Sequence, residues 1–148
     1  MKAAIEGVRV AGTTDGPATI VLLAPEDDED VLPIFIGIEE GISIARGLDA
    51  KGIGRPLTHD LLLDVMEELG GRVEKVVISD LRENTYIASL HLRTPRDAVV
   101  VDARPSDSLA LAARTNCPVE IAEAVFEEGR RPREEFADVE DIWEVVAA

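Results

Sequence analysis

The chain has 148 residues, of which 46% are hydrophobic and 3% aromatic, and 30 acidic against 15 basic residues give it a formal net charge of -15. A chain of this length builds one hydrophobic core, and its acidic surface repels nucleic acid, so any phosphate contact must be local, through clustered arginines or a bound metal. It has no apolar run of the roughly 18 residues that a spanning helix needs and no signal-peptide pattern, which predicts a cytoplasmic protein.

The amino-acid usage also bears on habitat. Lysine occurs only at Lys2, Lys51 and Lys75. High acidity, scarce lysine and few aromatic residues resemble the proteins of salt-accumulating organisms, and the alternative is an acidic bacterial protein of ordinary habitat.

The halophilic interpretation predicts a response to salt. We expect the melting temperature to rise as potassium chloride goes from about 0.1 M to above 1 M, because a Debye length of about 3 Å screens the self-repulsion of the acidic surface. A melting temperature that is flat or falls across this range contradicts that interpretation.

The first half of the chain predicts three strands and two helices. Apolar stretches over residues 3–10, 18–24 and 31–36 predict the strands. Apolar residues at helical spacing from Ile38 to Leu48, with acidic residues in the first turn, predict the first helix. A second amphipathic helix follows from Thr58, and we expect its apolar stripe to lie in the core: Leu61, Leu62, Val65, Met66 and Leu69.

The second half predicts a hairpin over residues 73–81 and 85–93, then a buried central strand at Val99–Val101 and a helix from Ser106. A short strand over 118–122, a helical turn over 123–128 and a terminal helix around Trp143 complete the chain. The expected fold class is α+β, a single domain with a mixed or antiparallel sheet, three main helices and a C-terminal helix. We place the domain at residues 1–128 and an acidic tail with a docking helix at 129–148.

Two segments share an unusual pattern, which we call the Arg-Pro corners. Arg104-Pro105 precedes Ser106 and Asp107, and Arg55-Pro56 precedes Thr58 and Asp60. Each pattern predicts a helix that begins with a hydroxyl N-cap and carries a carboxylate in its first turn. The repetition indicates either a shared site or a shared structural device.

Three motifs, at the third strand and the two corners, carry a family resemblance. Residues 32–37 with Glu39, residues 55–61 and residues 102–112 together resemble the bifunctional nuclease domain family over about residues 1–125. The resemblance implies an α+β fold, nuclease activity on DNA and RNA, and a homodimer. The family usually has alanine where this chain has Ser108, and the tail after Gly129 lies outside the match.

Phosphodiester cleavage needs an activated water, charge stabilisation at phosphorus and usually a metal held by carboxylates. The candidate metal ligands for Mg²⁺ or Mn²⁺ are Asp102, Asp107 and Glu39, with Asp60 as a further carboxylate at the catalytic site. For Glu39 the alternative is a dipole partner in the first turn of its helix.

The remaining site candidates come from the same corners. His59 is a candidate general base or acid, and Arg55 with Arg104 could clamp a phosphate at paired helix N-termini, where Thr58 and Ser106 also lie.

The alternative function is a non-catalytic regulatory or adaptor domain that binds an anionic ligand or a protein partner. In that case the corner aspartates satisfy first-turn amides and pair with arginines, so that the corners lock the two halves of the fold together. A dimer is expected for either function, because the N-terminal strands and the Trp143 helix offer more apolar surface than one small domain covers.

Overall fold

The strands of this protein form one mixed sheet in the computed structural model, which describes residues 1–50 and 55–146. In chain order the strands are β1 (Lys2–Thr13), β2 (Gly16–Pro25), β3 (Leu32–Ile36), β4 (Arg72–Arg82), β5 (Thr85–Arg93), β6 (Ala98–Ala103), β7 (Val119–Ile121) and β8 (Glu140–Asp141). The order across the sheet is β3-β2-β1-β7-β4-β5-β6, and β8 pairs with β1.

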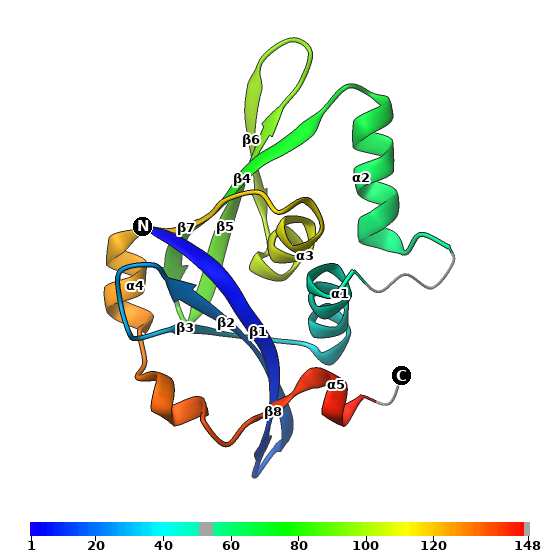
Figure 1. Ribbon diagram of the computed structural model, residues 1–148. Coiled ribbons are helices and arrows are strands. Elements are labelled where there is room, and N and C mark those ends of the chain that lie inside the picture. Colours follow the sequence, from blue (N-terminus) through cyan, green and yellow to red (C-terminus); the bar gives the residue numbers. More distant parts are fainter. Residues whose placement is uncertain (51–54, 147–148) are drawn as a thin grey trace.

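The short strand β7 joins two antiparallel groups. It pairs antiparallel with β1 and parallel with β4, so β1–β3 form one end of the sheet and β4–β6 the other (Figure 1). The predicted α+β fold in a single domain is confirmed, and the hairpin of residues 73–93 is part of it.

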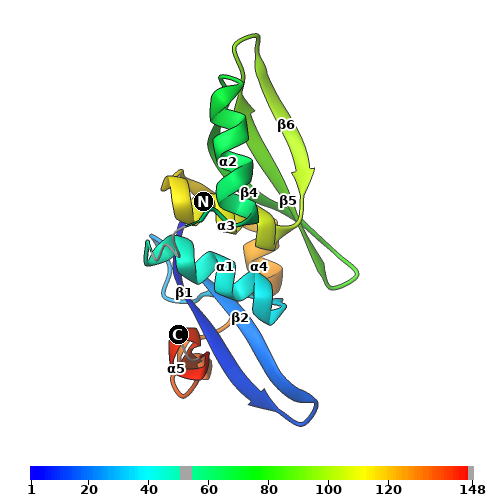
Figure 2. The same cartoon turned by 90° about the vertical axis from the view of Figure 1, so that its right-hand side faces the viewer.

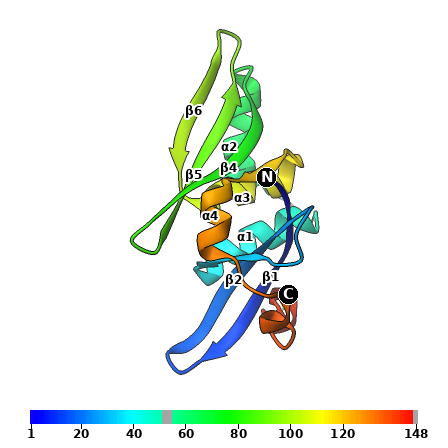
Figure 3. The same ribbon diagram turned by 90° about the vertical axis from the view of Figure 1, so that its left-hand side faces the viewer.

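The helices are α1 (Ile38–Leu48), α2 (Thr58–Glu68), α3 (Pro105–Thr115), α4 (Glu123–Gly129) and α5 (Ile142–Val145), with a 3-10 turn at Arg133–Phe136. Helices α1, α2 and α3 lie on one side of the sheet, as Figure 2 shows, and α4 lies on the other (Figure 3). The largest fully buried side chains include Phe126, Ile44, Ile78 and Leu109, so the core lies between these helices and the sheet. No helix within residues 1–50 and 55–146 is long and apolar enough to cross a membrane.

The acidic tail packs against the rest of the fold. Ile142 is buried in the main core cluster, and Arg133 forms an ion pair with Glu6 of β1. At the end of α4, Arg130 donates to Asp28 and Asp30, which ties the acidic loop after β2 to the opposite end of the chain. Tail and sheet therefore share one core.

The prediction of a buried central strand at Val99–Val101 is wrong. This segment is β6, the edge strand, and Val100 and Val101 are 62% and 43% exposed. A run of valines indicates only β propensity and hydrophobicity. An edge strand can have both properties, as a central strand does, so the run does not show where in the sheet the strand lies.

The prediction that the apolar stripe of α2 lies in the core is also wrong. No residue of α2 is buried, and four residues at helical spacing form an exposed stripe, which we call the α2 stripe: Leu61, Leu62, Val65 and Leu69. Leu63, on another side of the helix, packs against the core. The helix is amphipathic as predicted, but its more apolar face is turned outward.

The N-terminal strands and the Trp143 helix supply only part of the exposed apolar surface expected for a dimer, through Phe35 of β3 and Val145 of α5. Val8 and Val10 of β1 are buried, as is Ile142 beside Trp143. The largest group of exposed apolar side chains lies on α2, and Val100 and Val101 of β6 are exposed as well.

Candidate active site

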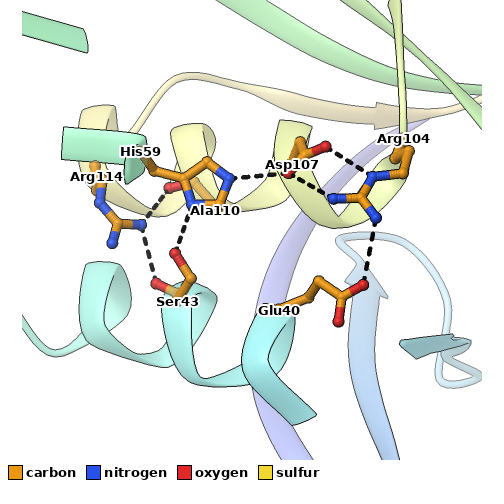
Figure 4. Close-up of polar contacts among 7 residues, drawn as sticks. All are labelled: Glu40, Ser43, His59, Arg104, Asp107, Ala110 and Arg114. Carbon is orange, nitrogen blue, oxygen red and sulfur yellow. Dashed lines mark hydrogen bonds and ion pairs between the residues drawn. The ribbon is translucent and has the colours of Figure 1, made fainter. Parts of the chain in front are cut away.

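His59, in the first turn of α2, has a hydrogen-bond partner on each ring nitrogen (Figure 4). Its Nδ1 lies 2.6 Å from Oγ of Ser43 on α1, and its Nε2 lies 3.0 Å from Oδ1 of Asp107 on α3. Because a carboxylate only accepts, the neutral imidazole donates its Nε2–H to Asp107 and accepts the Ser43 hydroxyl at Nδ1. The side chain of His59 is 15% exposed. Three helices therefore orient one largely buried imidazole.

Asp107 is itself held by the arginine of the second corner. Arg104 donates from Nε and Nη2 to the two carboxylate oxygens over 2.8 and 3.1 Å, and its Nη1 lies 3.4 Å from Oε1 of Glu40. The hydrogen bond from Arg104 lowers the pKa of Asp107 against the opposing effect of partial burial, and the contact with His59 lowers it further. Asp107 is thus an ionised, oriented acceptor for the imidazole.

Asp60 has a different partner, Arg114 near the end of α3. Arg114 donates from Nε to Oδ1 of Asp60 over 2.7 Å, and its Nη1 donates to the carbonyl oxygens of Ser43 and Ala110 over 2.9 Å each. The hydrogen bond from Arg114 lowers the pKa of Asp60, as does the backbone N–H of Leu57. The side chain of Arg114 is only 9% exposed, so a nearly buried guanidinium links all three helices.

Close packing of α1 against α3 brings these groups together. A Cβ on Gly47 would lie 2.8 Å from Cβ of Ala113, so only glycine permits this approach. Ser43 lies one turn before Gly47 on α1, and Asp107 and Arg114 lie on α3. The polar contacts of His59 and Asp60 then hold the start of α2 to this helix pair.

Both Arg-Pro corners begin helices, but the predicted N-caps are wrong. Pro105 is the first residue of α3, so Ser106 is already helical and is buried. Proline suits this position because its missing N–H would have no helical partner there. In α2 the N-cap is Leu57, Thr58 is the first helical residue, and the side chain of Asp60 accepts the backbone N–H of Leu57.

Three predicted site residues lie outside this network. Arg55, Thr58 and Glu39 are exposed, and their side chains form no hydrogen bond or ion pair with another residue in the described part of the chain. Arg55 precedes His59 by four residues in sequence and lies before the start of α2. Its guanidinium is exposed, and its hydrogen-bonding groups are not used by another described residue.

Asp102, Arg104 and Ser106 line a pocket of about 480 Å³ at the start of α3. Glu40 and the half-buried Tyr86 contribute to its walls. Ser108, where the family usually has alanine, is fully buried, and its hydroxyl has no hydrogen-bond partner among the described residues. The departure from alanine therefore adds no group to the network.

The predicted metal ligands do not converge. Both oxygens of Asp107 already accept from Arg104 and one from His59, whereas Asp102 lies on β6 and Glu39 on the exposed side of α1. Within residues 1–50 and 55–146, no group of three or more His, Cys, Asp or Glu side chains could hold a metal ion. These residues as placed do not fit a Mg²⁺ or Mn²⁺ centre.

Sequence reasoning missed three members of the network: Ser43, Arg114 and Glu40. Glu40 and Ser43 are three residues apart on α1, and Asp107 and Arg114 are two turns apart on α3, so each pair shares a helix face. This spacing was visible in the sequence. What it could not indicate was that the two faces oppose each other.

Comparisons with known proteins bear on this site. A family model described as the bifunctional nuclease domain matches residues 21–134. An uncharacterized protein of Mycobacterium tuberculosis is 39% identical over 124 residues, which is 82% of this chain and 71% of that protein.

Two plant proteins are more distant. Bifunctional nuclease 2 of Oryza sativa subsp. japonica is 25% identical over 119 residues, 78% of this chain and 36% of that protein. Bifunctional nuclease 2 of Arabidopsis thaliana is 26% identical over 109 residues, 71% of this chain and 33% of that protein. The chain thus spans about a third of the length of these plant relatives. Both Arg-Pro corners lie inside the region that the family model matches.

Proposed function

Because the chain belongs to the bifunctional nuclease domain family, we propose that it is a nuclease that hydrolyses phosphodiester bonds of DNA or RNA with little sequence preference. The observation that carries the proposal is the imidazole of His59, held between Ser43 and Asp107. An oriented, largely buried imidazole is the usual group for moving a proton during ester hydrolysis.

The charges around His59 assign the other roles. Asp107 positions the imidazole, as a carboxylate partner does for a catalytic histidine. Arg55 contacts the phosphate, because its guanidinium is exposed and not engaged by another described residue. Arg104 acts mainly by holding Asp107, since its Nε and Nη2 already donate to the two carboxylate oxygens of Asp107.

Dependence on Mg²⁺ or Mn²⁺ stays a prediction. The described residues offer no preformed centre, so the proposed proton transfer uses side chains of the chain alone. Nuclease assays with added manganese and with EDTA at high salt test the dependence directly.

Asp107→Asn tests the positioning role. We expect its nuclease activity to fall about 100-fold or more, because an amide at this position no longer favours the imidazole tautomer that donates from Nε2. The free energy of unfolding should change by no more than about 1 kcal/mol, since Arg104 is 64% exposed and readily hydrated. Activity on DNA and RNA is measured beside chemical denaturation.

The matched control is Asp80→Asn. Asp80 pairs with the exposed Arg82 over 2.6 Å, so the same charge is removed from a similar pair away from His59. Wild-type activity that is absent, or that is unchanged in Asp107→Asn, contradicts the proposed function.

We also propose a homodimer that covers the α2 stripe. The four side chains of the stripe are 45% to 74% exposed, and the unpaired edge of β6 lies at the same end of the sheet (Figure 2). An exposed stripe of apolar side chains is typical of an interface. Light scattering should give about twice 16.0 kDa, and Leu61→Glu should shift the particle to the monomer mass. A wild-type mass of 16.0 kDa at micromolar concentration contradicts the dimer.

One observation favours the adaptor function instead. Arg114 is nearly buried against Asp60, and such a pair links helices whether or not the protein is an enzyme. The His59 contacts extend beyond this pair toward a partly exposed carboxylate, which a purely structural link does not require.

A further inference from the structure

The group that His59 can activate as a nucleophile is the one that contacts the basic nitrogen of its ring. A base must have a nitrogen that accepts from the group it activates. Nε2 of the neutral ring carries the proton donated to Asp107, whose oxygens also accept from Arg104. Nδ1 is therefore the basic nitrogen, and Oγ of Ser43 lies 2.6 Å from it.

We propose that Ser43 is the nucleophile of this protein, activated by His59, which Asp107 orients. The order of contacts, carboxylate to imidazole to hydroxyl, is that of a catalytic triad, although the two ring nitrogens exchange roles relative to the serine-protease arrangement. The inference rests on the proposed function, and it names the covalent step by which that function proceeds.

The surroundings of Ser43 suit this role. Its side chain is partly exposed, and the three groups come from three different helices, so packing fixes their geometry. The guanidinium of Arg114 donates to the backbone carbonyl of Ser43 over 2.9 Å, which holds a positive charge against the backbone of the same residue. A fixed positive charge in a largely buried setting favours the negative charge that develops during attack on phosphorus.

The reaction has two balanced steps. In the first, Ser43 Oγ bonds to phosphorus while its proton passes to Nδ1 of His59. The bond from phosphorus to the leaving nucleotide oxygen breaks, and that oxygen takes the proton from His59. In the second, water attacks the seryl phosphodiester and gives a proton to His59, and Ser43 leaves with that proton. The products are a hydroxyl end, a phosphomonoester end and the unchanged serine.

The test uses a fluorophosphonate, diisopropyl fluorophosphate, with the wild-type protein. Attack by Ser43 releases fluoride, the proton passes through His59 to solvent, and the diisopropylphosphoryl group stays on the serine. Intact-mass and peptide mass spectrometry should find one adduct, at Ser43. Ser43→Ala should lose it, and His59→Gln should form it at least about tenfold more slowly, as expected for loss of a general base.

Ser79→Ala is the matched serine control. Ser79 donates to the carbonyl of Ile87 within the β4–β5 hairpin and has no histidine partner among the described residues, so its loss should leave labelling at the wild-type rate. Melting curves show whether Ser43→Ala remains folded. If that variant unfolds, the ratio of labelling rates between wild type and His59→Gln still decides the question.

The outcomes separate this inference from the proposed function. Labelling of Ser43 that depends on His59, without any nuclease activity, supports the activated serine and overturns the phosphodiester substrate. Nuclease activity with no labelling of Ser43, or with undiminished activity in a folded Ser43→Ala, overturns the serine nucleophile and leaves the nuclease intact. Labelling at equal rates in wild type and His59→Gln also overturns it.

Discussion

His59→Gln is expected to lower nuclease activity by about 100-fold to 10,000-fold, the range that a general acid or base contributes. Glutamine has a polar end that still reaches Ser43 or Asp107, but it does not take up and release a proton at neutral pH. The network should therefore persist while proton transfer is lost. The turnover number on DNA and RNA substrates is the quantity to measure.

The second histidine of the chain is the control for this variant. His91 lies on β5, paired in register with Lys75 of β4, and it is not part of the helix network. His91→Gln should keep wild-type activity. An equal loss of nuclease activity in both variants, or no loss of activity in His59→Gln, rules out His59 as the group that moves the proton.

Asp60→Asn is expected to lower the free energy of unfolding by about 2 to 3 kcal/mol. The substitution leaves the guanidinium of Arg114, 9% exposed, without its counter-charge. Removing one partner of a fully buried pair costs about 3 to 5 kcal/mol, and the 40% exposure of Asp60 together with the two carbonyl contacts of Arg114 reduces that cost. Urea denaturation measures the change.

The control is Asp64→Asn, an exposed carboxylate one turn further along α2, which should change stability by no more than about 0.5 kcal/mol. A cost for Asp60→Asn no larger than this contradicts the structural importance of the pair.

The same pair makes stability depend on acid. The pKa of Asp60 is lower in the folded protein than in the unfolded chain, chiefly because of Arg114. Its contribution is therefore fully present above the unfolded pKa of about 4 and is lost as the pH falls below that value. Wild type should lose more stability than Asp60→Asn between pH 6 and pH 3.

Local patterns determined most of the secondary structure and the fold class. The three N-terminal strands, the hairpin of residues 73–93 and the helices at both Arg-Pro corners follow from apolar periodicity and from proline and glycine at their ends. These signals act over a few residues, which is why they are readable without knowledge of the fold. The family resemblance came from the same short motifs.

Local patterns did not determine which apolar segments are buried. The α2 stripe and the valines of β6 are apolar, and hydrophobicity alone does not distinguish a surface that packs within the chain from one left open on it. Their exposure depends on the sheet order, which places β6 at an edge, and on the attachment of α2 through polar contacts at its start.

The sequence by itself singled out His59, Asp107 and Arg104, because each stands at a helix start where charge and hydrogen-bonding groups are concentrated. Only the tertiary structure decided which of them meet: Asp107 contacts His59 and Arg104, and Asp60 contacts Arg114. Ser43 contacts His59 from α1, at a position that no motif included. The physical reason is distance along the chain. His59 and Asp107 are 48 residues apart, and such contacts arise from the packing of α1, α2 and α3, not from local backbone preferences.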